Sequence, residues 1–125
     1  MNLVDSCGWI EYLANGENAD FFAQPLMETD NLIVPSICIL EVMKKIHQVR
    51  GENAASEVFS LMNQGIVVDL DADTAILSAK IGFELKLPLA DSVVLATARK
   101  NHAVLWTQDS HFDGMDGVKY IEKKS

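Results

Sequence analysis

The chain has 125 residues and a mass of 13.8 kDa, enough for one hydrophobic core and too little for two, so we expect a single domain over residues 1–125. Its 18 acidic and 10 basic residues give a net charge of −8, which argues against broad, non-specific binding to nucleic acid. No apolar run approaches the roughly 18 residues of a membrane span, and the first residues lack the basic start of a signal peptide, so we expect a cytoplasmic protein without a membrane segment.

Short β-like runs alternate with longer helical segments along the whole chain. Apolar runs predict strands at residues 3–4, 32–34, 66–68, 103–106 and 118–121. Helical spacing of apolar residues predicts helices at residues 6–13, 19–27, 37–49, 52–63, 71–85 and 89–101. Strands that are separated by helices pair in parallel, which predicts a three-layer α/β/α sandwich with a mainly parallel central sheet. Ligands in such folds bind beyond the carboxyl ends of the strands.

Two cysteines, Cys7 and Cys38, both stand in apolar sequence. Their small number and their surroundings predict buried free thiols in a reducing cytoplasm and not a disulfide. The chain also lacks a Gly-rich phosphate loop and a Gly-x-Ser-x-Gly nucleophile elbow, so the common nucleotide-binding and serine-hydrolase signatures are absent.

The three histidines show no spacing that predicts a structural zinc site; they are His47, His102 and His111. His111 follows Asp109 by two residues, which suggests an acid–base pair. We interpret His111 as a solvated loop histidine, the more common role for such a residue.

Four acidic residues stand inside or against apolar sequence where the predicted elements meet the carboxyl edge of the sheet. Asp5 follows the first strand and Asp109 follows the fourth, whereas Glu41 and Asp91 lie early in helices that begin near the same edge. A carboxylate in apolar surroundings is costly to desolvate unless something pairs with it, and no Lys or Arg adjoins three of the four in sequence. A divalent cation is the natural partner, so this pattern predicts metal-dependent hydrolysis of a phosphate ester.

Each of these carboxylates also has a structural interpretation that is at least as good when the residue is taken alone. Asp5 and Asp109 could cap the helical turns that follow them, and Asp91 could stabilise a helix start through the helix dipole. Glu41 could pair with a lysine one turn later on an exposed helix face, for only ~0.2–0.5 kcal/mol. The joint occurrence of all four at the expected ends of elements favours the functional interpretation.

The segment 69–73 resembles the start of a calcium-binding loop. The sixth position of that loop would be Thr74 in place of Gly, and the twelfth would be Lys80 in place of Glu. We therefore interpret Asp71 and Asp73 as caps at the entry of a helix.

Motifs from four parts of the chain combine into one pattern. They are the opening strand with Asp5-Ser6, the Pro35-Ser36 entry that leads to Glu41, Leu87-Pro88-Leu89-Ala90-Asp91 before an Ala-rich helix, and Thr107-Gln108-Asp109 with Phe112. Over nearly the whole chain this pattern resembles the PIN-domain ribonucleases, in particular the VapC-type toxins of bacterial and archaeal toxin–antitoxin pairs. The resemblance implies a PIN fold, Mg²⁺ or Mn²⁺ as cofactor, endonucleolytic cleavage of RNA, a homodimer and inhibition by a cognate antitoxin.

The resemblance also implies which residues act. Asp5, Glu41, Asp91 and Asp109 are the expected catalytic residues and the ligands of one or two Mg²⁺ or Mn²⁺ ions, with Glu41 either a ligand or the residue that orients the attacking water. Asp113 stands where some family members carry a further acidic residue, and we leave it outside the expected site. On so acidic a chain, RNA contacts must be local; the candidates are Lys44, Lys45 and Arg50, or Arg99 and Lys100.

Three other functions stay open at this point. The first is a PIN nuclease of RNA processing or decay without an antitoxin, which the absence of a small upstream reading frame for a DNA-binding partner would favour. The second is a catalytically silent interaction module that keeps the fold, and the third is a metal phosphatase that acts on small molecules. The hydrophobic content of 49% on so short a chain predicts an apolar surface that meets a partner, most simply a second copy of the chain.

Overall fold

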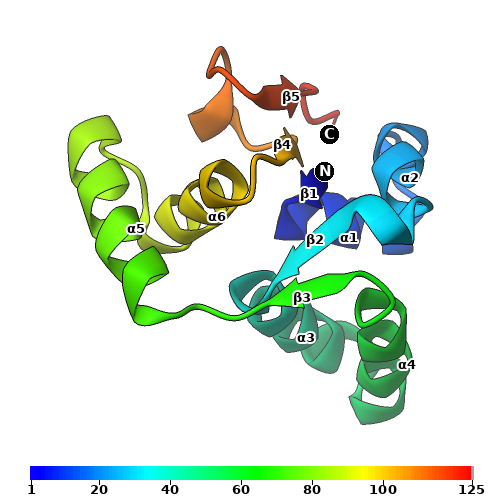
Figure 1. Cartoon of the computed structure of the whole chain (residues 1–125). Coiled ribbons are helices and arrows are strands. Elements are labelled where there is room, and N and C mark those ends of the chain that lie inside the picture. Colours follow the sequence, from blue (N-terminus) through cyan, green and yellow to red (C-terminus); the bar gives the residue numbers. More distant parts are fainter. Residues whose placement is uncertain (125) are drawn as a thin grey trace.

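In the computed structural model, which describes residues 1–124, five parallel strands form a sheet in the order β3-β2-β1-β4-β5 (Figure 1). The strands are β1 (Asn2–Val4), β2 (Leu32–Pro35), β3 (Ile66–Val68), β4 (Val104–Thr107) and β5 (Val118–Tyr120). The helices are α1 (Ser6–Leu13), α2 (Ala19–Leu26), α3 (Ser36–Arg50), α4 (Glu52–Met62), α5 (Ala72–Leu85) and α6 (Leu89–Lys100), with the 3-10 turns η1 (Thr29–Asn31) and η2 (Ser110–Phe112). This arrangement confirms the predicted α/β/α sandwich with a parallel sheet.

The strand order follows from the direction of the crossovers. From β1 the chain steps to β2 and then to β3, and the connections contain α1 to α4. It then returns past β1 to β4 through α5 and α6. Because parallel crossovers are right-handed, reversing the direction puts α5 and α6 on the opposite face of the sheet (Figure 1). The switch point, where a ligand site is expected, therefore lies between the carboxyl ends of β1 and β4.

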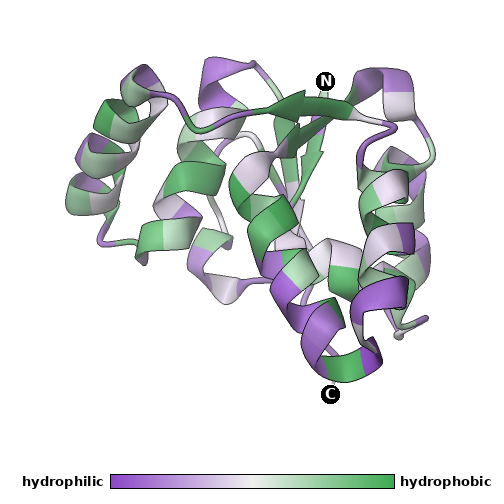
Figure 2. Cartoon of the chain, turned by 90° about the horizontal axis from the view of Figure 1, so that it is seen from below, coloured by the Kyte–Doolittle hydropathy of each residue, from purple (hydrophilic) through white to green (hydrophobic). Residues whose placement is uncertain are grey.

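The two cores come from alternating residues of the same strands. Val4 packs with Phe22 and Met62 against α1 to α4, whereas its neighbour Leu3 packs with Leu95 against α5 and α6. Successive strand residues point to opposite faces, so a strand covered on both sides has a continuous apolar sequence. Figure 2 shows strongly hydrophobic strands between helices that carry both hydrophobic and hydrophilic residues.

Gly8 allows α1 to approach the sheet closely. A Cβ atom at this position would meet the ring of Phe22 and a methyl group of Val4 at 2.6 Å. The absence of a side chain therefore sets the distance between α1 and β1, and with it the position of the residues that join them.

The ends of the predicted elements shift by about one residue in the structure, as expected for helix and strand boundaries. Pro25 lies inside the last turn of α2, and the helix ends at the next residue, so the proline shortens the helix without interrupting it. Asp71 caps α5 by accepting a 2.8 Å hydrogen bond from the backbone N–H of Thr74, which confirms its predicted role. That bond and Lys100 lower the pKa of Asp71 to about 2.

Both cysteines are free, as predicted, but their surroundings differ. Cys38 is buried in the apolar core, as predicted, whereas Cys7 is only partly buried and lies beside a carboxylate and a hydroxyl group. None of the helices within residues 1–124 is long and apolar enough to cross a membrane.

Candidate functional site

Asp5 lies directly after β1 at the predicted edge of the sheet and is only 3% exposed. Its Oδ1 accepts a 2.8 Å hydrogen bond from the backbone N–H of Ser6, so the residue does cap α1. Its Oδ2 accepts a 2.9 Å hydrogen bond from the hydroxyl of Thr107 on the neighbouring strand. Burial raises the pKa of this carboxyl group, although the hydrogen bonds oppose the rise. Asp5 is therefore both a helix cap and a nearly desolvated carboxylate.

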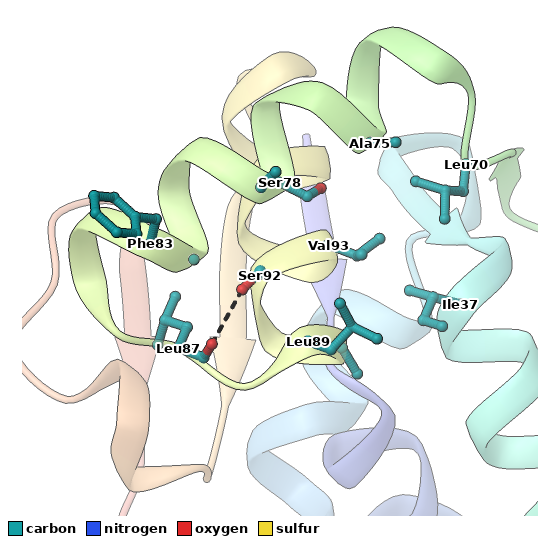
Figure 3. A pocket seen from close by; sticks show the side chains of 12 residues that line it. Ile37, Leu70, Ala75, Ser78, Phe83, Leu87, Leu89, Ser92 and Val93 are labelled. Carbon is teal, nitrogen blue, oxygen red and sulfur yellow. Dashed lines mark hydrogen bonds between the residues drawn. The ribbon is translucent and has the colours of Figure 1, made fainter.

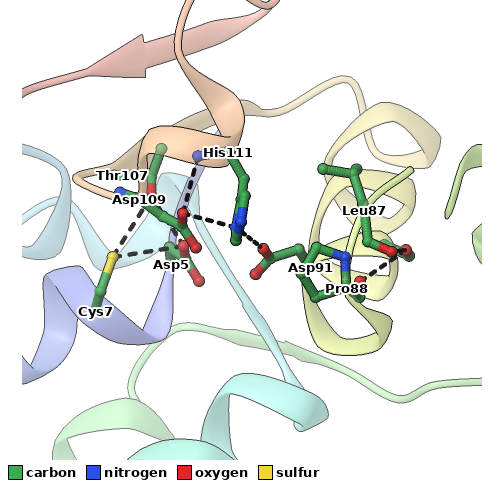
Figure 4. A network of polar contacts seen from close by, with 9 residues as sticks. Asp5, Cys7, Leu87, Pro88, Asp91, Thr107, Asp109 and His111 are labelled. Carbon is green, nitrogen blue, oxygen red and sulfur yellow. Dashed lines mark hydrogen bonds and ion pairs between the residues drawn. The ribbon is translucent and has the colours of Figure 1, made fainter. Parts of the chain in front are cut away.

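Thr107 connects Asp5 to Asp109. It is the last residue of β4 and is fully buried, and its Oγ1 accepts a 2.9 Å hydrogen bond from the backbone N–H of Asp109. Asp109 in turn caps η2, because its Oδ1 accepts a 3.0 Å hydrogen bond from the backbone N–H of His111. One hydroxyl group thus holds the two strand-end aspartates in a fixed relation (Figure 4).

Asp91 reaches the same edge from the first turn of α6, and its side chain is 15% exposed. Burial, followed by the nearby charges of Asp109 and Asp5, raises the pKa of Asp91 to about 6. Desolvation is thus the larger cause of the shift, and repulsion between the carboxylates adds to it.

His111 joins Asp91 to Asp109 (Figure 4). Its Nδ1 lies 2.9 Å from Oδ2 of Asp91 and 3.0 Å from Oδ1 of Asp109, and one possible ligand atom from each of the three residues lies within 4.8 Å of the others. The charge of Asp109, followed by the contact with Asp91, raises the pKa of the imidazole. The side chain of His111 is 53% exposed, as predicted for a solvated histidine, but that interpretation did not include the contacts with the two carboxylates. The spacing Asp109-x-His111 was the one signal in the sequence, since Asp91 is remote along the chain.

Glu41 lies beside this group in the second turn of α3. Its Oε1 accepts a 3.0 Å hydrogen bond from the hydroxyl of Ser6, the residue that follows Asp5. Its charge is a small further cause of the raised pKa of Asp5. Within residues 1–124, neither Lys44 nor Lys45 forms an ion pair with Glu41, so the predicted alternative of a helix salt bridge is not found.

Cys7 and Gln108 complete the surroundings of the site. Sγ of Cys7 lies 3.5 Å from Oδ2 of Asp5, and burial together with that charge raises the pKa of the thiol to about 12, so the thiol stays protonated. The side chain of Gln108 accepts a 2.9 Å hydrogen bond from the buried Asn18, which fixes the segment between β4 and Asp109. The local sequence around Asn18 and Gln108 does not indicate this contact, which joins residues 90 positions apart.

The structure thus brings the four predicted carboxylates to one edge of the sheet, with three of them in one linked group and Glu41 beside it. Asp91 and Asp109 share His111, and Asp5 is tied to Asp109 through Thr107. Glu41 contacts the group through Ser6 and does not belong to the set of atoms within 4.8 Å. Asp113 is exposed, follows η2 and stays outside the group.

The donor set fits a divalent cation. Asp5 is a buried carboxylate to which no Lys or Arg within residues 1–124 is paired, and Asp91 and Asp109 present further oxygens next to it. Carboxylate oxygens are the ligands that Mg²⁺ and Mn²⁺ prefer. A bound cation would remove the electrostatic cost of gathering these charges in a partly desolvated place.

Comparison with known proteins identifies the family and the fold. The family model of the PIN domain matches residues 3–118. No protein with a curated description matches the chain.

Several solved structures share the fold. A toxin–antitoxin complex from Klebsiella pneumoniae contains a chain with a TM-score of 0.82 and 22% identity, over 95% of this chain and 96% of that one. VapC20 of Mycobacterium tuberculosis, described as a toxin that cleaves the sarcin–ricin loop, has a TM-score of 0.75 and 16% identity, over 95% and 99% of the two chains. A DNA-bound VapBC complex from Salmonella typhimurium has a TM-score of 0.74 and 17% identity, over 98% of both chains. At these identities the similarity shows a shared fold.

Proposed function

This chain belongs to the PIN domain family, and we propose that it is a metal-dependent endoribonuclease that acts as the toxin of a toxin–antitoxin pair. The observation that carries this proposal is the convergence of Asp5, Asp91 and Asp109 at the switch point of the sheet. One of them, Asp5, is a buried carboxylate that no Lys or Arg of the described residues 1–124 neutralises. Such an arrangement is costly in a protein without a ligand and is suited to holding a divalent cation.

In this proposal the position of each residue determines its role. Asp5, Asp91 and Asp109 hold the cation, and Thr107 keeps Asp5 and Asp109 in register by donating to one and accepting from the other. When bound, Mg²⁺ or Mn²⁺ lowers the pKa of water and neutralises charge that develops on the phosphate during in-line attack. Glu41, oriented by Ser6, lies where it can serve as a further ligand or align the attacking water.

A groove beside Glu41 supports a local RNA contact. It has a volume of about 530 Å³, lies between α1, α3 and the start of α6, and is lined by Ser6, Glu41, Lys44 and Lys45 among others. The two lysines provide positive charge next to the carboxylate edge on a chain whose net charge is −8. Lys100, by contrast, pairs with Asp71 at 3.3 Å, which makes it a weaker candidate for a phosphate contact.

We further propose a cytoplasmic homodimer whose activity a cognate antitoxin inhibits. The comparison structures from Klebsiella pneumoniae and Salmonella typhimurium are toxin–antitoxin complexes, which supports an antitoxin partner for this chain. The support for a homodimer is apolar surface around α5 and α6, where a groove of about 450 Å³ opens between the two helices (Figure 3). Phe83 and Leu89 line this groove and are 87% and 86% exposed.

The test is cleavage of total RNA by the purified chain with Mn²⁺ or Mg²⁺, followed by mapping of the cut ends. We expect discrete cuts that a chelator prevents and that Asp91→Asn abolishes. Hydrolysis of a generic phosphomonoester without RNA cleavage would instead indicate a small-molecule phosphatase. If cleavage is unchanged in Asp91→Asn, the activity comes from a contaminant. The chain would then be a silent interaction module.

The antitoxin is tested separately. Co-expression with the product of a small reading frame directly upstream should relieve growth inhibition and yield a stable complex. If the chain cleaves RNA but no such reading frame exists, the function is RNA processing or decay.

A further inference from the structure

We propose that His111 is itself a metal ligand through Nδ1 and that this nitrogen makes the site prefer Mn²⁺ to Mg²⁺. This inference rests on the proposed function, because it takes the same metal site as given. It adds a nitrogen to a donor set that otherwise consists of carboxylate oxygens and assigns to one residue the choice of metal.

The distances around His111 match those between ligands of one ion. Its Nδ1 is 2.9 Å from Oδ2 of Asp91 and 3.0 Å from Oδ1 of Asp109. Neighbouring ligands of an octahedral ion that is bound at about 2.1 Å are themselves about 3 Å apart. The imidazole therefore already stands where a third ligand would stand, without a change of rotamer.

The backbone holds His111 in this place. Its N–H donates a 3.0 Å hydrogen bond to Oδ1 of Asp109, within the turn η2. The next residue, Phe112, is fully buried in the core that α5 and α6 cover and anchors the turn. His111 is thus fixed by a turn that is part of the fold, and its 53% exposed side chain leaves the site open to ions from solvent.

The chemistry of imidazole decides which ion benefits. Carboxylates suit Mg²⁺ and Mn²⁺ alike, but imidazole nitrogen is a ligand of the transition metals, and Mg²⁺ prefers oxygen. In the ligand form the proton of the neutral ring sits on Nε2, and Nδ1 offers its lone pair to the ion. A site with His111 as a ligand should therefore bind Mn²⁺ more tightly than Mg²⁺. A site of carboxylates alone would bind the two ions with more similar affinities.

The experiment measures binding to the full chain after treatment with a chelator, so it does not depend on RNA cleavage. Mn²⁺ binding is titrated by the loss of the signal of the free ion in electron paramagnetic resonance, and Mg²⁺ by competition. His111→Ala should weaken Mn²⁺ binding by about tenfold or more and change Mg²⁺ binding much less. His111→Asp, which restores an oxygen ligand, should keep Mg²⁺ binding and lose the preference for Mn²⁺. His47→Ala, at an exposed position of α3, is the matched control.

A spectroscopic signature completes the test. Electron spin echoes of bound Mn²⁺ should show modulation from a directly coordinated nitrogen, and His111→Ala should remove it. If His111→Ala instead strengthens the binding of both ions, the imidazole is a counter-charge that competes with the metal, and the proposal is wrong. Unchanged binding and an unchanged echo would also overturn it. Asp91→Asn should also lose Mn²⁺ binding. If this variant still binds Mn²⁺, the proposed metal site itself is misassigned.

Discussion

The hydroxyl of Thr107 donates a 2.9 Å hydrogen bond to Oδ2 of Asp5 and so joins the carboxyl ends of two neighbouring parallel strands. The same oxygen accepts a 2.9 Å hydrogen bond from the backbone N–H of Asp109. A single buried side chain therefore sets the relative position of two proposed metal ligands, although it carries no charge and binds no ion itself.

Thr107→Val should separate this positioning role from simple packing. The substitution keeps the shape but leaves the N–H of Asp109 and the carboxylate of Asp5 without their partner, so the free energy of unfolding should fall by about 1–3 kcal/mol. RNA cleavage should fall with it, measured under conditions in which both proteins are fully folded. Thr107→Ser keeps the hydroxyl and should restore most of the activity. Full activity in the valine variant would show that the hydrogen bonds do not matter for the site.

Asp5→Asn should abolish RNA cleavage and remove most of the rise in melting temperature that Mg²⁺ or Mn²⁺ causes. The metal-free variant should be as stable as the parent or more so, because a buried charge is replaced by a neutral group that can still cap α1. Thermal unfolding with and without metal measures both effects. A variant that is clearly less stable without metal and still cleaves RNA would mean that Asp5 is only a helix cap.

Glu41→Gln should reduce cleavage by roughly 10²-fold or more if the carboxylate aligns the attacking water, as is typical for the loss of an acid–base group. The melting temperature should hardly change, because the amide oxygen can still accept the hydrogen bond from Ser6. Ser6→Ala serves as a control that removes the hydrogen bond and keeps the charge. Persistent activity together with a small loss of stability would favour a structural role for Glu41.

The metal-free protein should lose stability as the pH rises from about 4 to about 6. The pKa of Asp91 is about 6 in the folded protein against an ordinary value of 3.8 for an aspartate, so the folded state holds the proton more tightly than the unfolded state does. This contribution to stability is fully present below the lower value and is lost as the pH rises through the higher one. The slope should be shallower in Asp91→Asn and should reverse for the parent with saturating Mn²⁺, because protons then compete with the ion. Urea unfolding across this pH range measures the slopes.

The chain should form a homodimer at micromolar concentration. The exposed Phe83 and Leu89 beside the groove of α5 and α6 provide apolar surface of the kind that a stable interface buries, and a symmetric dimer uses the same surface twice. Light scattering should give twice the chain mass, and the double variant Phe83→Ser with Leu89→Ser should give the monomer. The matched pair Val49→Ser with Met27→Ser removes exposed apolar residues that belong to other elements and do not line this groove, and it should leave the dimer intact. A monomeric parent with no partner from its native host would contradict this prediction.

The sequence by itself determined the layout of the fold and the identity of the four carboxylates. Alternation of short apolar runs with amphipathic helices is a local property, and parallel pairing follows from it through the handedness of crossovers. Asp5 and Asp109 were identifiable because Asp5 directly follows one predicted strand and Asp109 comes shortly after another, and the carboxyl ends of parallel strands share an edge. Asp71 was identifiable as a cap because a cap acts only within its own turn.

Only the tertiary structure decided how those residues meet. His111 lies two residues from Asp109 but twenty from Asp91, and its contact with Asp91 depends on where α6 packs against the turn after β4. The link from Thr107 to Asp5 spans 102 residues, and the hydrogen bond between Ser6 and Glu41 spans 35. Side-chain contacts of this kind are set by the packing of separate elements, whereas the local sequence pattern records only which face each element buries. For the same reason burial, which no local pattern measures, proved the main cause of the raised pKa of Asp5 and Asp91.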